Sequence, residues 1–215
     1  MTLTLHFHPL SSFCQKALVA LYENATPFDT VLVDFGNAES RAAFQRLWPI
    51  AKMPVLRDEA RGITVPEATI VIEYLEQYYP GHAPLIPRDP DAAREARLWD
   101  RFYDLYVNEL IGKIVTDKLR PAGKNDPVGV QNARALLGTA LGLVEERMAT
   151  RTWAIGSDFS LADCAAAPSL YYANRVAPFE ATHPHAAAYL GRLLTRPSYA
   201  RALREAEPYF KLFPG

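Results

Sequence analysis

Two hydroxyl groups and a thiol lie close together near the start of the chain, in the segment F-H-P-L-S-S-F-C-Q-K. The alternating apolar run L-T-L-H-F precedes this segment and the helical pattern A-L-V-A-L-Y-E follows it. Ser11, Ser12 and Cys14 are therefore predicted to lie where a strand turns into a helix. The first N–H groups of a helix have no intrahelical partner, and the helix dipole makes that end positive. Such a position stabilises an anion, and a thiolate is one such anion.

A purely structural explanation of the same residues competes with this chemistry. Serine is a common N-cap residue, and a small thiol inside a first helical turn is often buried in a core. A free thiol has a pKa of about 8.5, and each unit of lowering requires about 1.4 kcal/mol of preferential interaction with the thiolate. From this segment alone we favour a helix cap for Ser11 or Ser12 and a core position for Cys14.

A second candidate site is the turn Lys52-Met53-Pro54-Val55, which opens a strand pattern. Because proline cannot donate to a sheet ladder, it belongs at the start of a strand or in a tight turn. Both a trans proline and a cis proline satisfy this requirement. A cis bond would turn the backbone N–H and C=O of Val55 outward, where an extended peptide could pair as an added strand.

A third candidate is Pro66-Glu67-Ala68-Thr69, at the start of a predicted helix. Proline and an acidic residue are ordinary at such a position. The functional alternative is a second anion site, where backbone N–H groups hold a carboxylate and Glu67 pairs with an ammonium group.

A fourth motif is structural, and the histidines and cysteines show no metal-binding pattern. Ser160-Leu161-Ala162-Asp163 has the S-x-x-D form of a capping box. The five histidines show no H-x-x-x-H spacing and the cysteines no C-x-x-C pair, so we predict no metal site.

The elements that would position these residues change in kind along the chain. The first 80 residues are predicted to form a small mixed sheet with packed helices. The strands expected there are Leu3–Phe7, Phe28–Val33, 53–57 and 62–65, and the helices are Ser12–Asn24, Ser40–Leu47 and Glu67–Tyr79. We predict a domain at 1–80, a proline-rich linker at 81–90 and an all-helical domain at 91–215.

The helical domain is predicted to begin with a long helix. Its expected core stripe is Leu98, Phe102, Leu105, Tyr106, Leu110 and Ile114. The later helices are expected at Val130–Met148, Ser160–Arg175, Pro184–Thr195 and Ser198–Glu207.

The composition is that of an ordinary globular protein. Of 215 residues, 49% are apolar and 22% charged, and the formal net charge is −1. This balance argues against a nucleic-acid partner, which needs a concentrated basic surface. We expect no membrane partner, because no run approaches the roughly 18 apolar residues of a membrane span. We expect no signal peptide, because the first residues form a strand pattern with no basic region before a hydrophobic segment. Cys14 and Cys164 lie far apart, which fits a reducing cytoplasm better than a disulfide framework.

Taken together and in order, these motifs resemble those of a cytosolic glutathione transferase of the serine type. The resemblance rests on S-x-x-C before the first helix, K-M-P-V-L, P-E-A-T-I-V-I-E-Y-L and F-S-L-A-D, and it covers essentially the whole chain. It implies a thioredoxin-like N-terminal domain that binds glutathione and a helical C-terminal domain that forms much of the electrophile pocket. It also implies a cis proline at Pro54, a homodimer, and a role in detoxification with glutathione as co-substrate.

The resemblance assigns roles to the residues at the first helix. Ser11 matches the hydroxyl that donates to the glutathione sulfur, and Ser12 is a neighbouring alternative because some members carry paired serines. Ser11 and Cys14 also resemble the two ends of a glutaredoxin C-x-x-C whose nucleophilic first cysteine is replaced. That comparison favours activation of a bound thiolate over disulfide chemistry.

The resemblance also assigns the peptide-binding residues. In the Lys52–Val55 turn, which includes Met53 and Pro54, Val55 would clamp the cysteinyl backbone and Lys52 would meet the glycyl carboxylate. Glu67 and the N–H of Ala68 would take the γ-glutamyl end. For the electrophile pocket the candidates are Tyr103 and Tyr106 on the long helix, with Leu10; interdomain packing is an equal alternative for the two tyrosines.

The chain departs from the family pattern in two places. Many members have serine where this chain has Ala68, so one hydroxyl bond to the γ-glutamyl carboxylate is lost, although Thr69 could partly compensate. Many members also read asparagine-proline-x-glycine-lysine where this chain has W-P-I-A-K. These departures predict weakened glutathione binding. They keep open a non-catalytic binding or regulatory module, and paired serines near a cysteine keep open a glutathione-dependent isomerase of the maleylacetoacetate type.

Overall fold

The structure is a computed structural model that describes residues 2–214. Its N-terminal part is a four-stranded sheet with three helices. These elements are β1 (Leu3–Phe7), α1 (Ser12–Glu23), β2 (Asp29–Leu32), α2 (Ala38–Leu47), β3 (Val55–Asp58), β4 (Ile63–Pro66) and α3 (Ala68–Tyr78). The strand order is β2-β1-β3-β4. β1 and β2 are parallel, whereas β3 is antiparallel to both β1 and β4. The predicted small mixed sheet is confirmed.

The alternating sequence of β1 sets which side of the sheet is buried. Leu3, Leu5 and Phe7 are buried, whereas Thr4 and His6 between them are partly exposed. Successive side chains of a strand point to opposite faces, so the three apolar residues all reach one core. That core also contains most of α1, which is buried all round from Cys14 to Leu21.

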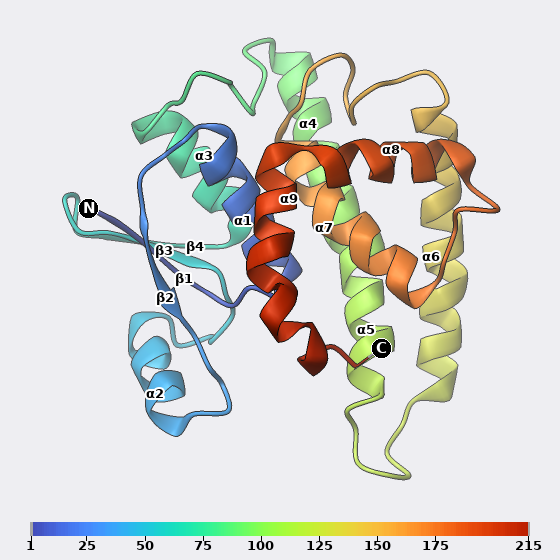
Figure 1. Ribbon diagram of the computed structural model, residues 1–215, viewed down its shortest axis with the longest axis horizontal. Helices are drawn as coiled ribbons and strands as arrows, with labels where there is room; N and C mark the ends of the chain where they lie inside the picture. The colour runs from blue at the N-terminus through green and yellow to red at the C-terminus, as the bar shows by residue number, and fades with distance from the viewer. Residues whose placement is uncertain (1, 215) are drawn as a thin grey trace.

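The second part of the chain is helical, as predicted. Its elements are α4 (Pro90–Phe102), the π-helical segment η1 (Tyr103–Asn108), α5 (Glu109–Asp117), α6 (Pro127–Met148), α7 (Leu161–Val176), α8 (Pro184–Thr195), α9 (Pro197–Ala206) and the 3₁₀ segment η2 (Glu207–Leu212). Figure 1 shows the strands on one side of the molecule and these helices on the other, with α1 between them. α1 packs on α7 and α9, and one hydrophobic core therefore spans both parts.

The start of α7 confirms the predicted capping box. The Ser160 side chain accepts from the backbone N–H of Asp163 at N3, and the Asp163 carboxylate accepts from the Ser160 N–H at 2.9 Å. No helix within residues 2–214 is long and apolar enough to cross a bilayer.

The expected core stripe of the long helix is only partly correct. Phe102 and Ile114 are buried, but Leu98, Leu105 and Tyr106 are 63%, 42% and 49% exposed. The physical reason is that charged residues occupy the buried side of the helix, where Asp100 and Asp104 pair with Lys16.

Candidate functional site

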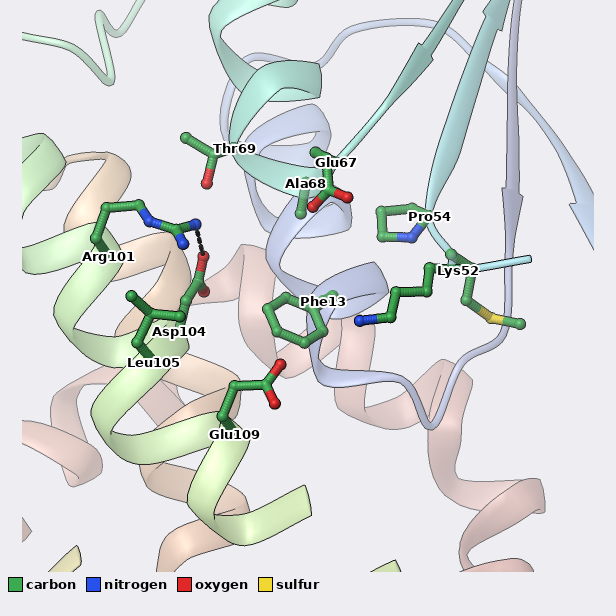
Figure 2. A pocket seen from close by; sticks show the side chains of 11 residues that line it. Phe13, Lys52, Pro54, Glu67, Ala68, Thr69, Arg101, Asp104, Leu105 and Glu109 are labelled. Atoms are coloured by element: carbon green, nitrogen blue, oxygen red, sulfur yellow. Dashed lines mark ion pairs between the residues drawn. The ribbon is translucent and has the colours of Figure 1, made fainter. Parts of the chain in front are cut away.

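Two adjoining cavities open between the sheet part and the helical part. The first, here called the polar cavity, has a volume of about 210 Å³. The sheet part lines it with Phe13, residues 52–54 and residues 67–69. α4, η1 and α5 line it with Arg101, Asp104, Leu105 and Glu109, and Figure 2 shows Lys52 and Arg101 on opposite walls.

The second cavity, here called the apolar cavity, also has a volume of about 210 Å³. Its lining from the turn before α1 is residues 10–13. The helical part supplies Asn108, Glu109, Ile111, Gly112, Val115, Tyr172 and Phe213. Because Phe13 and Glu109 line both cavities, a ligand held in one would lie next to a ligand held in the other.

Ser11 caps α1 and lines the apolar cavity at the same time. Its backbone is extended (φ −72°, ψ 119°), and its Oγ accepts from the Cys14 N–H at 3.4 Å. A hydroxyl oxygen can accept one hydrogen bond and still donate its own proton. The cap therefore leaves the Ser11 O–H available to a ligand, and Ser12, which lines the same cavity, is a second available hydroxyl.

Cys14 is a core residue, the position that the sequence favoured, and not the catalytic group that was kept as its alternative. The thiol is fully buried at 0% exposure and lines neither cavity. Burial raises the pKa of Cys14 to about 12, against a smaller opposing contribution from Ser11. A neutral, inaccessible thiol is neither a nucleophile nor a ligand-binding group.

The turn at residues 52–54 has the predicted cis peptide bond between Met53 and Pro54. Val55, which was predicted to clamp a peptide backbone, belongs to the central strand β3 and does not line the polar cavity. It is opposite His6 on one side and Pro66 on the other, and its side chain is fully buried. Met53, one residue before the cis bond, lines the polar cavity in its place.

The loop before Lys52 has alanine where many family members have glycine, and it still adopts a left-handed backbone conformation at that position. Ala51 has φ +56°, in the left-handed region that glycine adopts without penalty. For alanine this conformation costs roughly 1–2 kcal/mol. The turn is therefore made in spite of the missing glycine, and Lys52 reaches the cavity wall (Figure 2).

The N-terminus of α3 forms an anion-binding surface in the polar cavity. Glu67 is the N-cap residue but makes no side-chain cap bond, and its φ of +71° is rare for a residue with a side chain. The first-turn N–H groups, at Ala68 and Thr69, are thus left for a ligand. Such strain at the wall of a cavity is typical of functional positions.

A buried ion cluster supports this wall from behind. Lys16 Nζ lies 2.6 Å from Asp100 Oδ1 and 2.8 Å from Asp104 Oδ2, and it donates to Thr69 Oγ1 at 2.8 Å. The Thr69 hydroxyl in turn donates to Asp100 Oδ2 at 2.8 Å. Burial raises the pKa of Asp100, and the attraction of Lys16 opposes this rise. The cluster joins α1 and α3 to α4 and η1, and so fixes the two walls of the polar cavity.

Neither tyrosine predicted for the electrophile pocket lies in a cavity wall. Tyr103 is fully buried in the core, and its hydroxyl has no hydrogen-bond partner within the described residues. Tyr106 is 49% exposed but lines neither cavity. The π-helical turn that begins at Tyr103 directs other residues of the same segment toward the cavities, among them Asp104 and Asn108. Leu10, the third predicted residue, does line the apolar cavity.

Several lining residues were not predicted from the sequence. Phe13 lies between the predicted residues of the first helix, and Arg101, Asn108 and Glu109 have the pattern of solvent-facing residues of a long helix. A partial signal was the three- and four-residue spacing of residues 101, 104, 105 and 108, which places them on one helix face, whereas residue 109 joins residue 104 at the cavity through the π-turn. Within residues 2–214, no group of three or more His, Cys, Asp or Glu residues is placed to hold a metal ion.

Both parts of the chain match models of known protein domains. Residues 5–83 match the family model of the glutathione S-transferase N-terminal domain, and residues 127–192 match that of the C-terminal domain. FtsZ-localized protein A of Caulobacter vibrioides is 31% identical over 174 residues, which are 78% of this chain and 75% of that protein. A probable maleylacetoacetate isomerase of Caenorhabditis elegans is 28% identical over 167 residues, which are 77% and 76% of the two chains.

A solved structure is similar over almost the whole chain. It is a glutathione S-transferase from Methylobacillus flagellatus with glutathione bound. The two sequences are 25% identical, and the superposition covers 93% of this chain and 98% of that chain with a TM-score of 0.84.

Proposed function

The chain belongs to the glutathione S-transferase family, and we propose that it binds glutathione and transfers its sulfur to a small hydrophobic electrophile. Its fold is that of the family, a thioredoxin-like N-terminal domain followed by a helical C-terminal domain. The observation that carries the proposal is the pair of adjoining cavities. A charged cavity suited to a peptide meets an apolar cavity at Phe13 and Glu109, and two serine hydroxyls line the second.

The charges of the polar cavity suit glutathione, which has two carboxylates and one ammonium group. Lys52 pairs with the glycyl carboxylate on one wall, and the free N–H groups at the start of α3 hold the γ-glutamyl carboxylate on the other. Glu67, which lines the same cavity, pairs with the ammonium group. The backbone of Met53 replaces that of Val55 as the contact for the cysteinyl residue.

The sulfur of a peptide bound in this way would lie near the N-terminus of α1. There the Ser11 hydroxyl donates to the thiolate, with Ser12 as the alternative donor, while the helix dipole adds positive potential. Both effects favour the charged form and so lower the pKa of the bound thiol. The thiolate then attacks an electrophile in the apolar cavity, and no covalent enzyme intermediate forms.

The proposal includes a homodimer that works in a reducing cytoplasm. An ion pair between Arg97 of α4 and Glu73 of α3, whose atoms lie 2.7 Å apart, links two helices that both carry exposed apolar side chains. Among them Ile70 is 51% and Leu98 63% exposed. Exposed apolar residues gathered on two neighbouring helices are typical of a subunit interface.

Glutathione titration combined with two serine variants tests the proposal. Calorimetry is expected to show glutathione binding, and Ser11→Ala is expected to lower kcat/KM for chlorodinitrobenzene by about tenfold to a hundredfold near neutral pH. The pH profile of kcat/KM should move to higher pH in that variant, because the thiol loses a donor to its charged form. Ser12→Ala, one residue away on the same cavity wall, is the matched control.

The pH profiles of the two serine variants show which hydroxyl donates to the thiolate. An unchanged Ser11→Ala profile together with a shifted Ser12→Ala profile would transfer the donor role to Ser12. Unchanged profiles in both variants would refute activation by a serine.

A second candidate function is a non-catalytic binding module. The observation that favours it is the relative named FtsZ-localized protein A, which is 31% identical. The loss of the serine hydroxyl at Ala68 is consistent with it. Absence of glutathione binding at millimolar concentration would support the module and refute the transferase.

A further inference from the structure

We infer that Asn108 and Glu109 select the electrophile, so that the apolar cavity takes uncharged compounds whose reacting carbon is conjugated to an oxygen acceptor, such as enones, and disfavours anionic ones. This inference rests on the proposed function and makes it more specific. It is carried by two adjacent side chains at the end of η1 and by the shape of that segment.

Asn108 is a buried amide without a partner. The residue is only 7% exposed, and it lines the apolar cavity. Within residues 2–214 no hydrogen bond engages its side chain. The amide atoms are not among the fully buried polar atoms that lack a partner, so they keep accessible surface in the cavity. The amide is best explained as a donor kept for a ligand in the cavity.

The π-helical turn places both residues at the cavities. The Glu109 N–H donates to the Asp104 carbonyl, five residues back. In a regular α-helix residues five apart are about 140° apart around the axis, so Asp104 and Glu109 would face different directions. The wider π-turn brings both to the polar cavity and leaves Asn108 at the apolar one. Such π-turns occur frequently at functional sites.

Glu109 sets the electrostatic character of the apolar cavity. Among the described residues that line this cavity, it is the only ionised side chain. It is exposed and makes no ion pair within residues 2–214, so its charge acts on any ligand beside it. An anionic electrophile would also lie close to the glutathione thiolate, which repels it further.

The reaction that fits this arrangement is conjugate addition. The thiolate sulfur forms a bond to the β-carbon of the enone, and the π-electron pair moves to the carbonyl oxygen. The Asn108 N–H donates to that oxygen as its negative charge develops. A proton from water then reaches the α-carbon and replaces the proton that the thiol released, so no group leaves and no redox partner is needed.

Three probes with glutathione test the inference. 3-Benzoylacrylamide is a neutral enone, 3-benzoylacrylate is its anionic counterpart, and benzyl chloride is a neutral electrophile without oxygen. The variants are Asn108→Leu, Asn108→Ala and Glu109→Gln, and Glu146→Gln on the exposed surface of α6 is the control for loss of a charge. Each rate is divided by the uncatalysed rate of the same probe.

The expected results separate the two residues. Asn108→Leu and Asn108→Ala lower kcat/KM for the neutral enone by about tenfold to a hundredfold and leave benzyl chloride within about twofold. The wild type prefers the amide to the acid by about tenfold, and Glu109→Gln reduces that preference by about fivefold, because one nearby solvent-screened charge is removed. Glu146→Gln changes neither ratio.

Several results would overturn the inference. They are equal losses on both neutral probes in the Asn108 variants, no loss on either probe, or a wild type that prefers the acid. A protein that binds glutathione and turns over none of the three probes would overturn it as well. Absence of glutathione binding by calorimetry would instead refute the proposed function itself.

Discussion

Replacing Lys16 by methionine removes the buried cation that neutralises two carboxylates between the domains. Lys16 is 1% exposed and lies within 2.6 Å and 2.8 Å of oxygens of Asp100 and Asp104, which are themselves buried. Methionine keeps most of the side-chain volume, so the loss is chiefly one of charge. Removing one partner of a buried ion pair typically costs about 3–5 kcal/mol, because an uncompensated charge stays behind. We expect the free energy of unfolding of Lys16→Met at pH 8 to fall by this amount.

The effect should depend on pH in a defined direction. Burial raises the pKa of Asp100 in the folded protein. A carboxyl with a raised pKa binds its proton more tightly when folded, so its contribution to stability falls as pH rises from the unfolded to the folded value. Without Lys16, the attraction that opposes this rise is gone, and the folded pKa of Asp100 moves higher still. The loss of stability in Lys16→Met should therefore be smaller at pH 5, where a larger fraction of the Asp100 carboxyl is protonated, than at pH 8.

Urea unfolding followed by tryptophan fluorescence at pH 5 and pH 8 measures both effects. The m-value shows whether the transition stays comparable between proteins. Lys211→Met, at an exposed position near the C-terminus, is the control for the substitution itself. Adding Asp100→Asn and Asp104→Asn to Lys16→Met should restore part of the lost stability, since no buried charge then lacks a partner. A deficit below about 1 kcal/mol at pH 8, or one equal at both pH values, would refute the reasoning.

Two further predictions concern the loop and the proposed dimer. Ala51→Gly removes the strain of φ +56°, so urea unfolding should show a stability equal to that of the wild type or up to about 1 kcal/mol higher. Ala51→Val should be less stable than the wild type. A loss of stability with glycine would contradict the assigned strain. Leu98→Glu places a charge on the exposed face of α4. Light scattering should show a monomer for this variant and a dimer for the wild type. Leu136 is an exposed leucine on α6, and its control variant Leu136→Glu should remain dimeric.

The sequence was sufficient for the fold because its local signals agree with one another. The β1 strand was predicted with its observed bounds from strict alternation, and Pro184–Thr195 from proline at its start and apolar spacing. The capping box at Ser160 was equally clear, since its two partners lie within one helical turn. Such features depend on neighbours in the chain, and those are visible in the sequence.

The buried face of the long helix could not be predicted in the same way. Sequence patterns assign aspartate and lysine to solvent, because isolated charges are rarely buried. Asp100 and Asp104 are buried because Lys16, more than 80 residues earlier, neutralises them. Leu98, Leu105 and Tyr106 are displaced to the surface as a result. The error therefore comes from one long-range interaction that no local pattern reveals.

Two acidic residues of one segment end up with different tasks for the same reason. Asp104 and Glu109 both line the polar cavity, but Asp104 is held by Lys16 at 2.8 Å and by the nearby Arg101 at 3.5 Å. Its charge is neutralised by the protein and serves to join the domains. No ion pair within residues 2–214 engages Glu109, so its charge is left to act on whatever enters the cavities. Asp104, whose charge is neutralised, holds the geometry of the cavity wall. Glu109, whose charge is not neutralised, is the residue that can select between ligands.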